Sequence, residues 1–306
     1  MSSTRTSQLP PLGALKEAAR SAWPERRLER FRLHDEGWTN LVLESDNRLI
    51  FRFPRWKEVA QSLDYEVRLL DFLSRRLSIP IPQPVRLAVL SNPRGWPFIA
   101  YPKLPGRPLS KIRRLDETGR RKLGVFVGTL LHELALLPAR PLVWIGAPEG
   151  DSRAWAKKYH ALQARYHRQA ESRFAAPLRH KLERAFDGFF ADLRNARYRP
   201  IATHQDLGPD HLLWDVQTHR PTGVIDWEDL RLGDPAFDLT GLTCLGSSRM
   251  RSWIRERKSD RDPTFEERLA FYRAIWPLHG VLYAAETRNW ELFHAQLTLL
   301  NATAGE

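Results

Sequence analysis

The chain has 306 residues, of which 42% are hydrophobic, so it can bury a sizeable core as one large domain or two modest ones. Its single cysteine, Cys244, excludes an internal disulfide and suits a reducing cytoplasm, and no apolar run approaches the roughly 18 residues of a membrane-spanning helix. The net charge of +12 favours acidic partners, but the basic residues are spread along helical stretches without zinc spacing or a ribonucleoprotein motif. We therefore expect neither a specific nucleic-acid site nor membrane contact.

The first hundred residues predict a β-rich unit. Residues 1–12 are polar and predict a disordered tail without the apolar core of a secretory signal. Between residue 27 and about residue 101, short runs rich in β-branched and aromatic residues surround one helical stretch at residues 59–77. The predicted strands are residues 39–43, 49–53, 85–90 and 98–101.

Helical periodicity dominates from residue 109 onward. Residues 123–134 carry apolar side chains at i, i+3, i+4 and i+7, which predicts a buried core helix and gives His132 a structural role. Residues 155–194 predict two amphipathic helices broken near Ala176 and Pro177, and residues 265–300 predict another helical pair.

The strongest chemical pattern surrounds three side chains, Asp206, His211 and Asp226. Strand-like runs at residues 212–214 and 222–225 flank a turn-rich connection, so they predict a hairpin with these side chains at its open end. Phosphoryl transfer needs a carboxylate that accepts the proton of the attacking hydroxyl and further groups that hold the metal bridging the phosphates. Taken singly, each piece would be better explained as a chance His-x-Asp or as a strand end before a turn, and it is their order and close spacing that favour catalysis.

This pattern resembles the catalytic loop and metal-binding strand of the aminoglycoside and macrolide phosphotransferases, which are small-molecule kinases with a protein-kinase-like fold. Other stretches resemble the family in the right order, and the matches span roughly residues 35–240. They are residues 37–40 with 49–55 for the first hairpin, 63–70 for a supporting helix, 101–109 for the hinge and 233–239 after the metal-binding strand. The resemblance implies an α+β bilobal fold with a β-rich lobe (residues 1–101), a hinge (102–108) and a mostly helical lobe (109–306).

The resemblance also implies roles for the motif residues. Asp206 would be the catalytic base, His211 and Asp226 would bind Mg²⁺, and His204 would brace the loop. Most of the family carries Asn where this chain has His211, although the aminoglycoside 2''-kinases and macrolide kinases tend to carry His. Because Mg²⁺ prefers oxygen ligands, His211 leaves Mn²⁺ possible and leaves open whether the imidazole binds the metal directly.

The phosphate-binding groups are expected in the β-rich lobe. No P-loop and no Gly-x-Gly-x-x-Gly pattern is present, so the turn at residues 36–40 is the only candidate cover, and a plain hairpin turn fits it equally well. By resemblance, Arg52 would reach the α- and β-phosphates and Glu66 would pair with it. Without the downstream motif, a surface arginine and a solvated glutamate would be the better interpretation.

The hinge would hold the base of the nucleotide. Tyr101 would form the back of the pocket, Pro102 can offer only its carbonyl, and Leu104 can donate its backbone N–H. A carbonyl acceptor two residues before an N–H donor matches the adenine edge. A bulky aromatic at this position leaves GTP open as the donor. An ordinary proline-rich linker between the lobes is the alternative.

The sequence thus predicts a cytoplasmic kinase that transfers the γ-phosphate of ATP or GTP to a free hydroxyl of a small molecule, an antibiotic of aminoglycoside or macrolide type. The alternatives are a kinase of another metabolite, a nucleotide-binding pseudokinase in which His211 has abolished metal binding, and a basic nucleic-acid-binding helical protein. A polycationic acceptor needs an acidic cleft, for which Asp229, Asp234, Glu267 and Glu286 are candidates. The sequence leaves the oligomeric state open.

Overall fold

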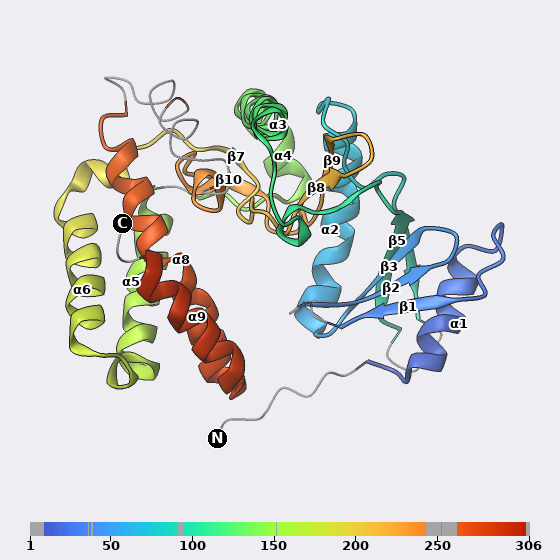
Figure 1. The fold of residues 1–306 in the computed structure, drawn as a ribbon, viewed down its shortest axis with the longest axis horizontal. Coiled ribbons are helices and arrows are strands. Elements are labelled where there is room, and N and C mark those ends of the chain that lie inside the picture. Colours follow the sequence, from blue (N-terminus) through green and yellow to red (C-terminus); the bar gives the residue numbers. More distant parts are fainter. Residues whose placement is uncertain are drawn as a thin grey trace.

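A computed structural model describes residues 9–303 with the exception of residues 36, 38, 91–94, 151, 243–251 and 253–261. Cys244 and most of the predicted tail therefore lie outside the described residues. The described chain forms a smaller lobe built on a β-sheet and a larger lobe of helices, which lie side by side in Figure 1. The predicted α+β bilobal fold is confirmed, and the lobe boundaries at residues 101 and 109 stay predictions.

The smaller lobe is a five-stranded antiparallel sheet in the order β1-β2-β3-β5-β4. Its strands are β1 (Phe31–His34), β2 (Asn40–Ser45), β3 (Leu49–Pro54), β4 (Arg86–Val89) and β5 (Pro97–Pro102). Two helices cover it, α1 (Leu12–Ala22) on one face and α2 (Lys57–Ser74) on the other. Four of these strands and α2 match the predicted elements.

The side chains of β3 point alternately to the two faces of the sheet, and this decides which of them face α2. Successive side chains of a strand point to opposite faces, so Phe51 and Phe53 are buried in the core beneath α1. Ile50 and Arg52 point to the other face, toward α2, where Ile50 packs near Leu63. A charged residue in an otherwise apolar strand is thereby directed at the helix that carries Glu66.

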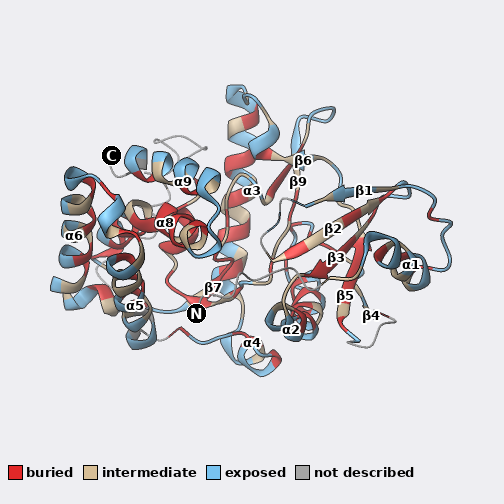
Figure 2. Ribbon diagram, turned by 90° about the horizontal axis from the view of Figure 1, so that it is seen from below, coloured by how far each residue is buried: buried red, intermediate tan, exposed pale blue. Residues whose placement is uncertain are grey.

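The larger lobe is a set of helices around one extended core, and its central helix α8 is buried over most of its length (Figure 2). The helices are α3 (Glu117–Leu136), α4 (Ala139–Ile145), α5 (Ser152–Gln169), α6 (Ala176–Ala191), α8 (Phe265–Thr287) and α9 (Trp290–Thr303). Short 3₁₀ turns are η1 (Leu109–Lys111), η2 (Glu171–Arg173), η3 (Leu193–Ala196) and η4 (Phe237–Leu239). The predicted helical pairs at residues 155–194 and 265–300 are confirmed.

Besides the five-stranded sheet, the described chain forms two small sheets. Strand β6 (Arg107–Pro108) pairs with β8 (Leu212–Asp215), and β8 pairs with β9 (Arg220–Val224) as an antiparallel hairpin, as predicted. Strand β7 (Ile201–Thr203) pairs with β10 (Arg231–Gly233). Gly106 precedes β6 with φ +87°, and a Cβ there would lie 2.7 Å from the carbonyl oxygen of Trp214, so the chain can pass this close only as glycine.

Two predictions about the elements need correction. Helix α1 begins at Leu12, inside the segment predicted as a tail, and neither α1 nor β1 was predicted. Helix α3 buries one face only, and His132 is exposed on the other, so it is not a core histidine.

No single described helix is long and apolar enough to cross a membrane, although α3 and α4, bent by 84°, have the required length and composition as a pair.

Asp234, proposed above as a substrate-binding carboxylate, is a core residue instead. It is fully buried and accepts hydrogen bonds from Arg268 Nε (2.6 Å) and from the Tyr272 hydroxyl (2.6 Å). Arg268 is also fully buried, and its second partner is Asp262, at 2.6 Å. This network fastens the segment after β10 to the start of α8.

Removing the cation of this network should destabilise the fold. Arg268→Met leaves Asp234 and Asp262 without their counter-charge, which costs about 3–5 kcal/mol when a buried ion pair loses one partner. Urea unfolding monitored by circular dichroism measures the change. The matched control is Arg75→Met, whose exposed pair with Asp71 in α2 should contribute less than about 1 kcal/mol. Equal effects of the two substitutions would contradict the assignment.

Candidate active site

Three side chains from two loops meet at the open end of the β8–β9 hairpin. Asp206, His211 and Asp226 each offer one ligand atom within 4.8 Å of the others. Nδ1 of His211 lies 3.4 Å from Oδ2 of Asp206, and Nε2 lies 3.3 Å from Oδ2 of Asp226. The hairpin thus brings together the residues that the sequence motif singled out, as its pattern predicts.

The loop that carries Asp206 is fixed by a buried histidine. Nδ1 of His204 accepts a hydrogen bond from the N–H of Asp206 (3.3 Å), and its Nε2 donates to the carbonyl of Ile225 (3.1 Å). Burial, with the charge of His211, lowers the pKa of His204 to about 3, so the ring is neutral and can serve as both donor and acceptor. His204 therefore connects the strand end before Asp226 to the backbone of Asp206.

The carboxylate of Asp238 also fixes the loop that carries Asp206. Asp238 accepts hydrogen bonds from the N–H groups of His204 (2.8 Å) and Gln205 (2.9 Å). Gln205 and Asp226 both have positive φ, 73° and 68°, a conformation that costs energy for residues with a side chain. The surrounding hydrogen bonds hold this strained backbone in place. Asp238 lies in the segment 233–239 that resembled the family, but its role was not predicted.

The environment of Asp206 suits a proton acceptor. Burial raises the pKa of its carboxyl to about 6. The charge of His211 lowers this pKa, and the charge of Asp226 raises it. A carboxylate poised close to neutral pH can accept a proton during a reaction and release it afterwards.

His211 and Asp226 fit a divalent cation. Nδ1 of His211 lies 2.6 Å from the carbonyl oxygen of Asp206, so it donates there and leaves the lone pair of Nε2 directed at Asp226. Burial lowers the pKa of His211, but the charges of Asp226 and Asp206 outweigh it and the net shift is upward. A nitrogen lone pair facing a carboxylate is a donor set that Mn²⁺ accepts readily and Mg²⁺ less so.

Arg52 is the centre of a charge network that includes both lobes. Its guanidinium bonds to the buried Glu66 of α2 through Nη1, and through Nη2 to Asp226 (3.2 Å) and Glu228 (2.6 Å). The pair predicted between Arg52 and Glu66 is present. Burial raises the pKa of Glu66 to about 7 despite the attraction of Arg52, with Glu228 and Asp226 adding to the shift. Among the described residues, one buried Glu66 oxygen has no hydrogen-bond partner, and Arg52 faces three carboxylates, so this site has more negative than positive charge and fits an added metal ion.

Glu228 also belongs to this network, although it was not among the predicted site residues. Its carboxylate accepts from Thr39 Oγ1 (2.9 Å) and Asn40 Nδ2 (3.1 Å) at the start of β2, besides Arg52. The described part of the predicted phosphate cover is thus bonded to the loop after β9; residues 36 and 38 of that turn lie outside the described residues. Asp226 and Glu228 flank the fully buried Trp227, and this i, i+2 spacing was the available signal.

The hinge geometry is compatible with base binding. Tyr101 is buried beside Leu63 and Ile99 at the back of the sheet lobe. Within the described residues, the N–H of Leu104 donates to no backbone carbonyl, whereas the neighbouring Lys103 N–H donates to Arg48. The N–H of Leu104 is therefore available to a ligand, and the roles of Tyr101, Pro102 and Leu104 stay predictions.

Sequence comparison decides the family. A family model described as the phosphotransferase enzyme family matches residues 30–277. The chain belongs to the phosphotransferase enzyme family. The predicted resemblance and the prediction of a phosphotransferase are confirmed.

Three similar proteins with known names are each 23% identical in sequence to this chain. Viomycin phosphotransferase of Streptomyces vinaceus is 23% identical over 261 residues, which cover 81% of this chain and 85% of that protein. A solved GDP and kanamycin complex of APH(2")-IIia has a TM-score of 0.84 at 23% identity and covers 95% of this chain and 98% of its own. Macrolide 2'-phosphotransferase MphH of Brachybacterium faecium has a TM-score of 0.67 at 23% identity and covers 94% and 98%. These solved structures support the bilobal fold.

Because Nε2 of His211 faces the carboxylate of Asp226, we expect metal binding to depend on both residues. Asp226→Ala should weaken Mn²⁺ binding by more than about 10–100-fold, the usual effect of losing even a group that only orients a ligand. His211→Asn should retain binding and shift preference toward Mg²⁺, because an amide oxygen is the harder ligand. Calorimetric titration of each variant with both ions, in the presence of nucleotide, measures this. Unchanged metal affinity in Asp226→Ala would exclude Asp226 as a ligand.

Proposed function

We propose that this phosphotransferase moves the γ-phosphate of ATP or GTP to a hydroxyl of a small-molecule antibiotic in the cytoplasm. The observation that carries the proposal is the convergence of Asp206, His211 and Asp226 beneath the Arg52 network. Viomycin, aminoglycoside and macrolide phosphotransferases among the similar proteins support an antibiotic acceptor. Three of the similar solved structures are GDP complexes, which supports a nucleotide between the lobes.

The proposed reaction uses the residues as follows. Asp206 accepts the proton of the acceptor hydroxyl while the hydroxyl oxygen forms a bond to the γ-phosphorus, and the bond from that phosphorus to the β-γ bridging oxygen breaks. Asp226 and His211 would hold the divalent ion, which when bound neutralises charge on the phosphate oxygens. His204 keeps Asp206 in place through its backbone N–H. Arg52 presents a guanidinium to the remaining phosphates, and Leu104 N–H with Pro102 C=O would bind the base.

The charges beside the site favour an acceptor with few positive charges. Asp229, which lies close enough to raise the pKa of Asp206, faces Arg231 at 3.9 Å. Burial, and then the charge of Arg231, lowers the pKa of the neighbouring Lys158 to about 8. Glu286 is already bonded to Arg165 (2.9 Å) and Gln169 (3.1 Å). With Asp234 in the core, few of the candidate carboxylates are left for a polycation.

A substitution at the base tests the reaction itself. Asp206→Asn should keep nucleotide binding but lower turnover by about 10²–10⁴, the usual contribution of a positioned base. The matched control is Asp210→Asn, an exposed carboxylate of the same loop that bonds to Ser110, which should turn over at nearly the wild-type rate. The assay is a phosphorylation screen over macrolides, cyclic peptides and aminoglycosides with both nucleotides. Nucleotide binding without turnover of any acceptor in the wild-type protein would favour a pseudokinase.

Salt dependence tests the charge of the acceptor. Attraction between exposed charges is screened over about 10 Å at 0.1 M salt and about 3 Å at 1 M, so an acceptor held by ion pairs binds less well as salt rises. We expect the KM of a confirmed acceptor to change little between these conditions. The KM of the nucleotide, measured in parallel, serves as the internal control because triphosphate binding is electrostatic. A steep rise in acceptor KM would indicate a polycationic substrate.

A further inference from the structure

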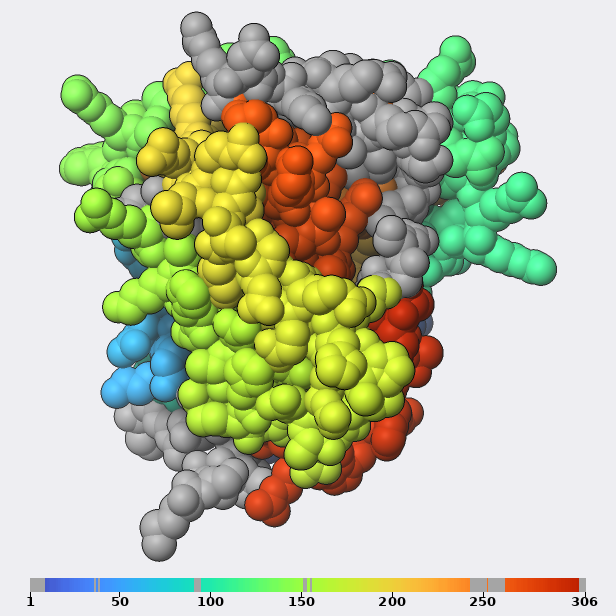
Figure 3. Space-filling model, turned by 90° about the vertical axis from the view of Figure 1, so that its left-hand side faces the viewer, coloured from blue at the N-terminus to red at the C-terminus, as the bar shows by residue number. Residues whose placement is uncertain are grey.

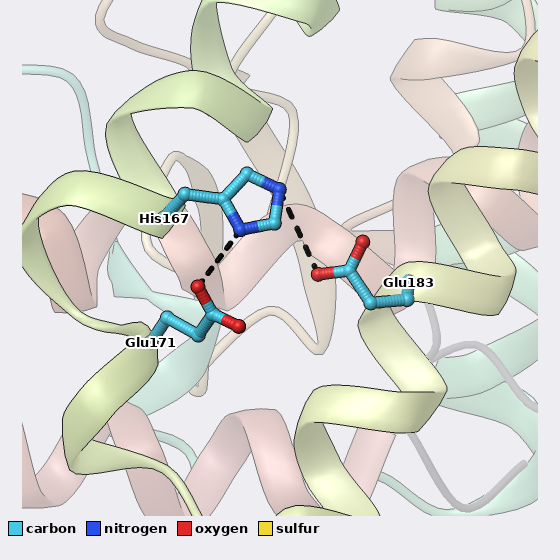
Figure 4. Close-up of side chains that lie close together, drawn as sticks. All are labelled: His167, Glu171 and Glu183. Atoms are coloured by element: carbon cyan, nitrogen blue, oxygen red, sulfur yellow. Dashed lines mark hydrogen bonds and ion pairs between the residues drawn. The ribbon is translucent and has the colours of Figure 1, made fainter.

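A second candidate cation site lies in the helical lobe, outside the active site. It consists of His167 near the end of α5, Glu171 of η2 and Glu183 of α6, whose ligand atoms lie within 4.8 Å of one another. Figure 3 faces the side of the molecule formed by α5 and α6, and Figure 4 shows His167 between the two carboxylates. The three side chains are 32–40% exposed, so a metal ion can enter from solvent.

The imidazole of His167 faces a different carboxylate with each nitrogen. Nδ1 is 3.0 Å from Oε2 of Glu171, a hydrogen-bond distance, whereas Nε2 is 3.8 Å from Oε1 of Glu183, too far for a hydrogen bond. A neutral imidazole has one N–H, so if Nδ1 donates to Glu171, the lone pair of Nε2 points at Glu183. A metal ion with bonds of about 2.0–2.2 Å to both atoms fits between them.

The position of Glu171 is that of an orienting group. In metal sites the ligating histidine usually donates its other ring N–H to a carboxylate, which fixes the tautomer and the ring orientation. Gln163, one turn before His167 on α5, approaches the other oxygen of Glu183 at 3.5 Å. His167 and Glu183 are therefore the ligands in this arrangement, and Glu171 and Gln163 support them.

The two glutamates lack a cationic side chain other than His167. Within the described part of the chain, neither forms an ion pair with a lysine or arginine, although the chain carries a net charge of +12. Oε1 of Glu183, the atom that faces Nε2, is buried and has no hydrogen-bond partner in the part of the chain that the structure describes. A buried carboxylate oxygen without a donor is costly, and a bound cation would satisfy it.

The neighbouring Tyr166 supplies an independent observation. Its side chain is fully buried, and its hydroxyl has no hydrogen-bond partner among the described residues. Its ring lies next to that of His167, with 4.9 Å between the two ring centroids. A buried hydroxyl without a partner, next to the cluster of His167, Glu171 and Glu183, indicates a missing polar or ionic occupant.

We propose that His167 and Glu183 bind a divalent transition-metal ion of the Zn²⁺ class, which joins α5 to α6, with Glu171 orienting the imidazole. One imidazole nitrogen with carboxylate oxygen suits Zn²⁺ or Co²⁺ better than Mg²⁺ or Ca²⁺, and water completes the coordination. This site is independent of the proposed phosphoryl transfer, because none of its residues contacts Asp206, His211 or Asp226 within the described chain.

The test is titration of the full chain with Co²⁺ and Zn²⁺ by calorimetry and visible absorption, without nucleotide. Because the active site also offers a histidine and carboxylates, Asp226→Ala is titrated in parallel to assign each binding event. His167→Ala and Glu183→Gln should each remove one ion, and the rise in unfolding temperature that this ion causes should disappear. Glu171→Gln should weaken the same event by about 10–100-fold, as expected for an orienting group.

The matched control is His180→Ala, which removes an exposed histidine of α6 without touching the cluster and should leave both binding events unchanged. Far-ultraviolet circular dichroism checks that each variant is folded. Equal stoichiometry and affinity in wild type and His167→Ala would overturn the proposal. So would loss of every binding event in Asp226→Ala alone, because the active site would then account for all the metal bound.

Discussion

The guanidinium of Arg52 connects the two lobes, and most of the site geometry depends on it. It is buried, and it bonds to Glu66 from the lobe that carries it and to Asp226 and Glu228 from the other. Since all three partners are acidic, removing the arginine would leave the buried carboxylate of Glu66 and the half-buried carboxylates of Asp226 and Glu228 without this cation, a change far more costly than the loss of one exposed ion pair. The relative placement of the lobes at the cleft is thus specified by electrostatics as well as by the covalent hinge.

This network also explains why the site suits a metal nucleotide. One arginine does not balance three carboxylates. Burial raises the pKa of Glu66, the charges of Glu228 and Asp226 raise it further, and one Glu66 oxygen has no hydrogen-bond partner among the described residues. A divalent ion near Asp226 relieves that excess, and the phosphates that accompany it offer acceptors to Arg52. Metal and phosphate are therefore complementary: each would reduce the cost of burying the other.

Much of this arrangement is readable from the sequence because it is local. The β8–β9 hairpin follows from two strand-like runs around a turn, and the helices of the larger lobe follow from their apolar spacing. Helix α1 lacks a capping signal, since Pro11 at its N-cap makes no side-chain hydrogen bond, although its apolar residues are spaced as in an amphipathic helix. Glu228 could not be assigned, because Thr39 and Arg52 lie more than 170 residues away in the chain. Asp234 was misjudged for the same reason: α8 decides its burial.

The short stretch between Asp234 and Asp238 has a consequence for how this protein tolerates variation. One carboxylate of this stretch, Asp234, is bonded to Arg268 of α8, and the other, Asp238, accepts hydrogen bonds from the N–H groups of His204 and Gln205. Displacement of the helix would therefore be transmitted to the proton-accepting loop over a span of five residues. Substitutions deep in α8 would then alter catalytic speed without altering ligand affinity, so a kinetic phenotype can arise from a residue that no substrate ever touches.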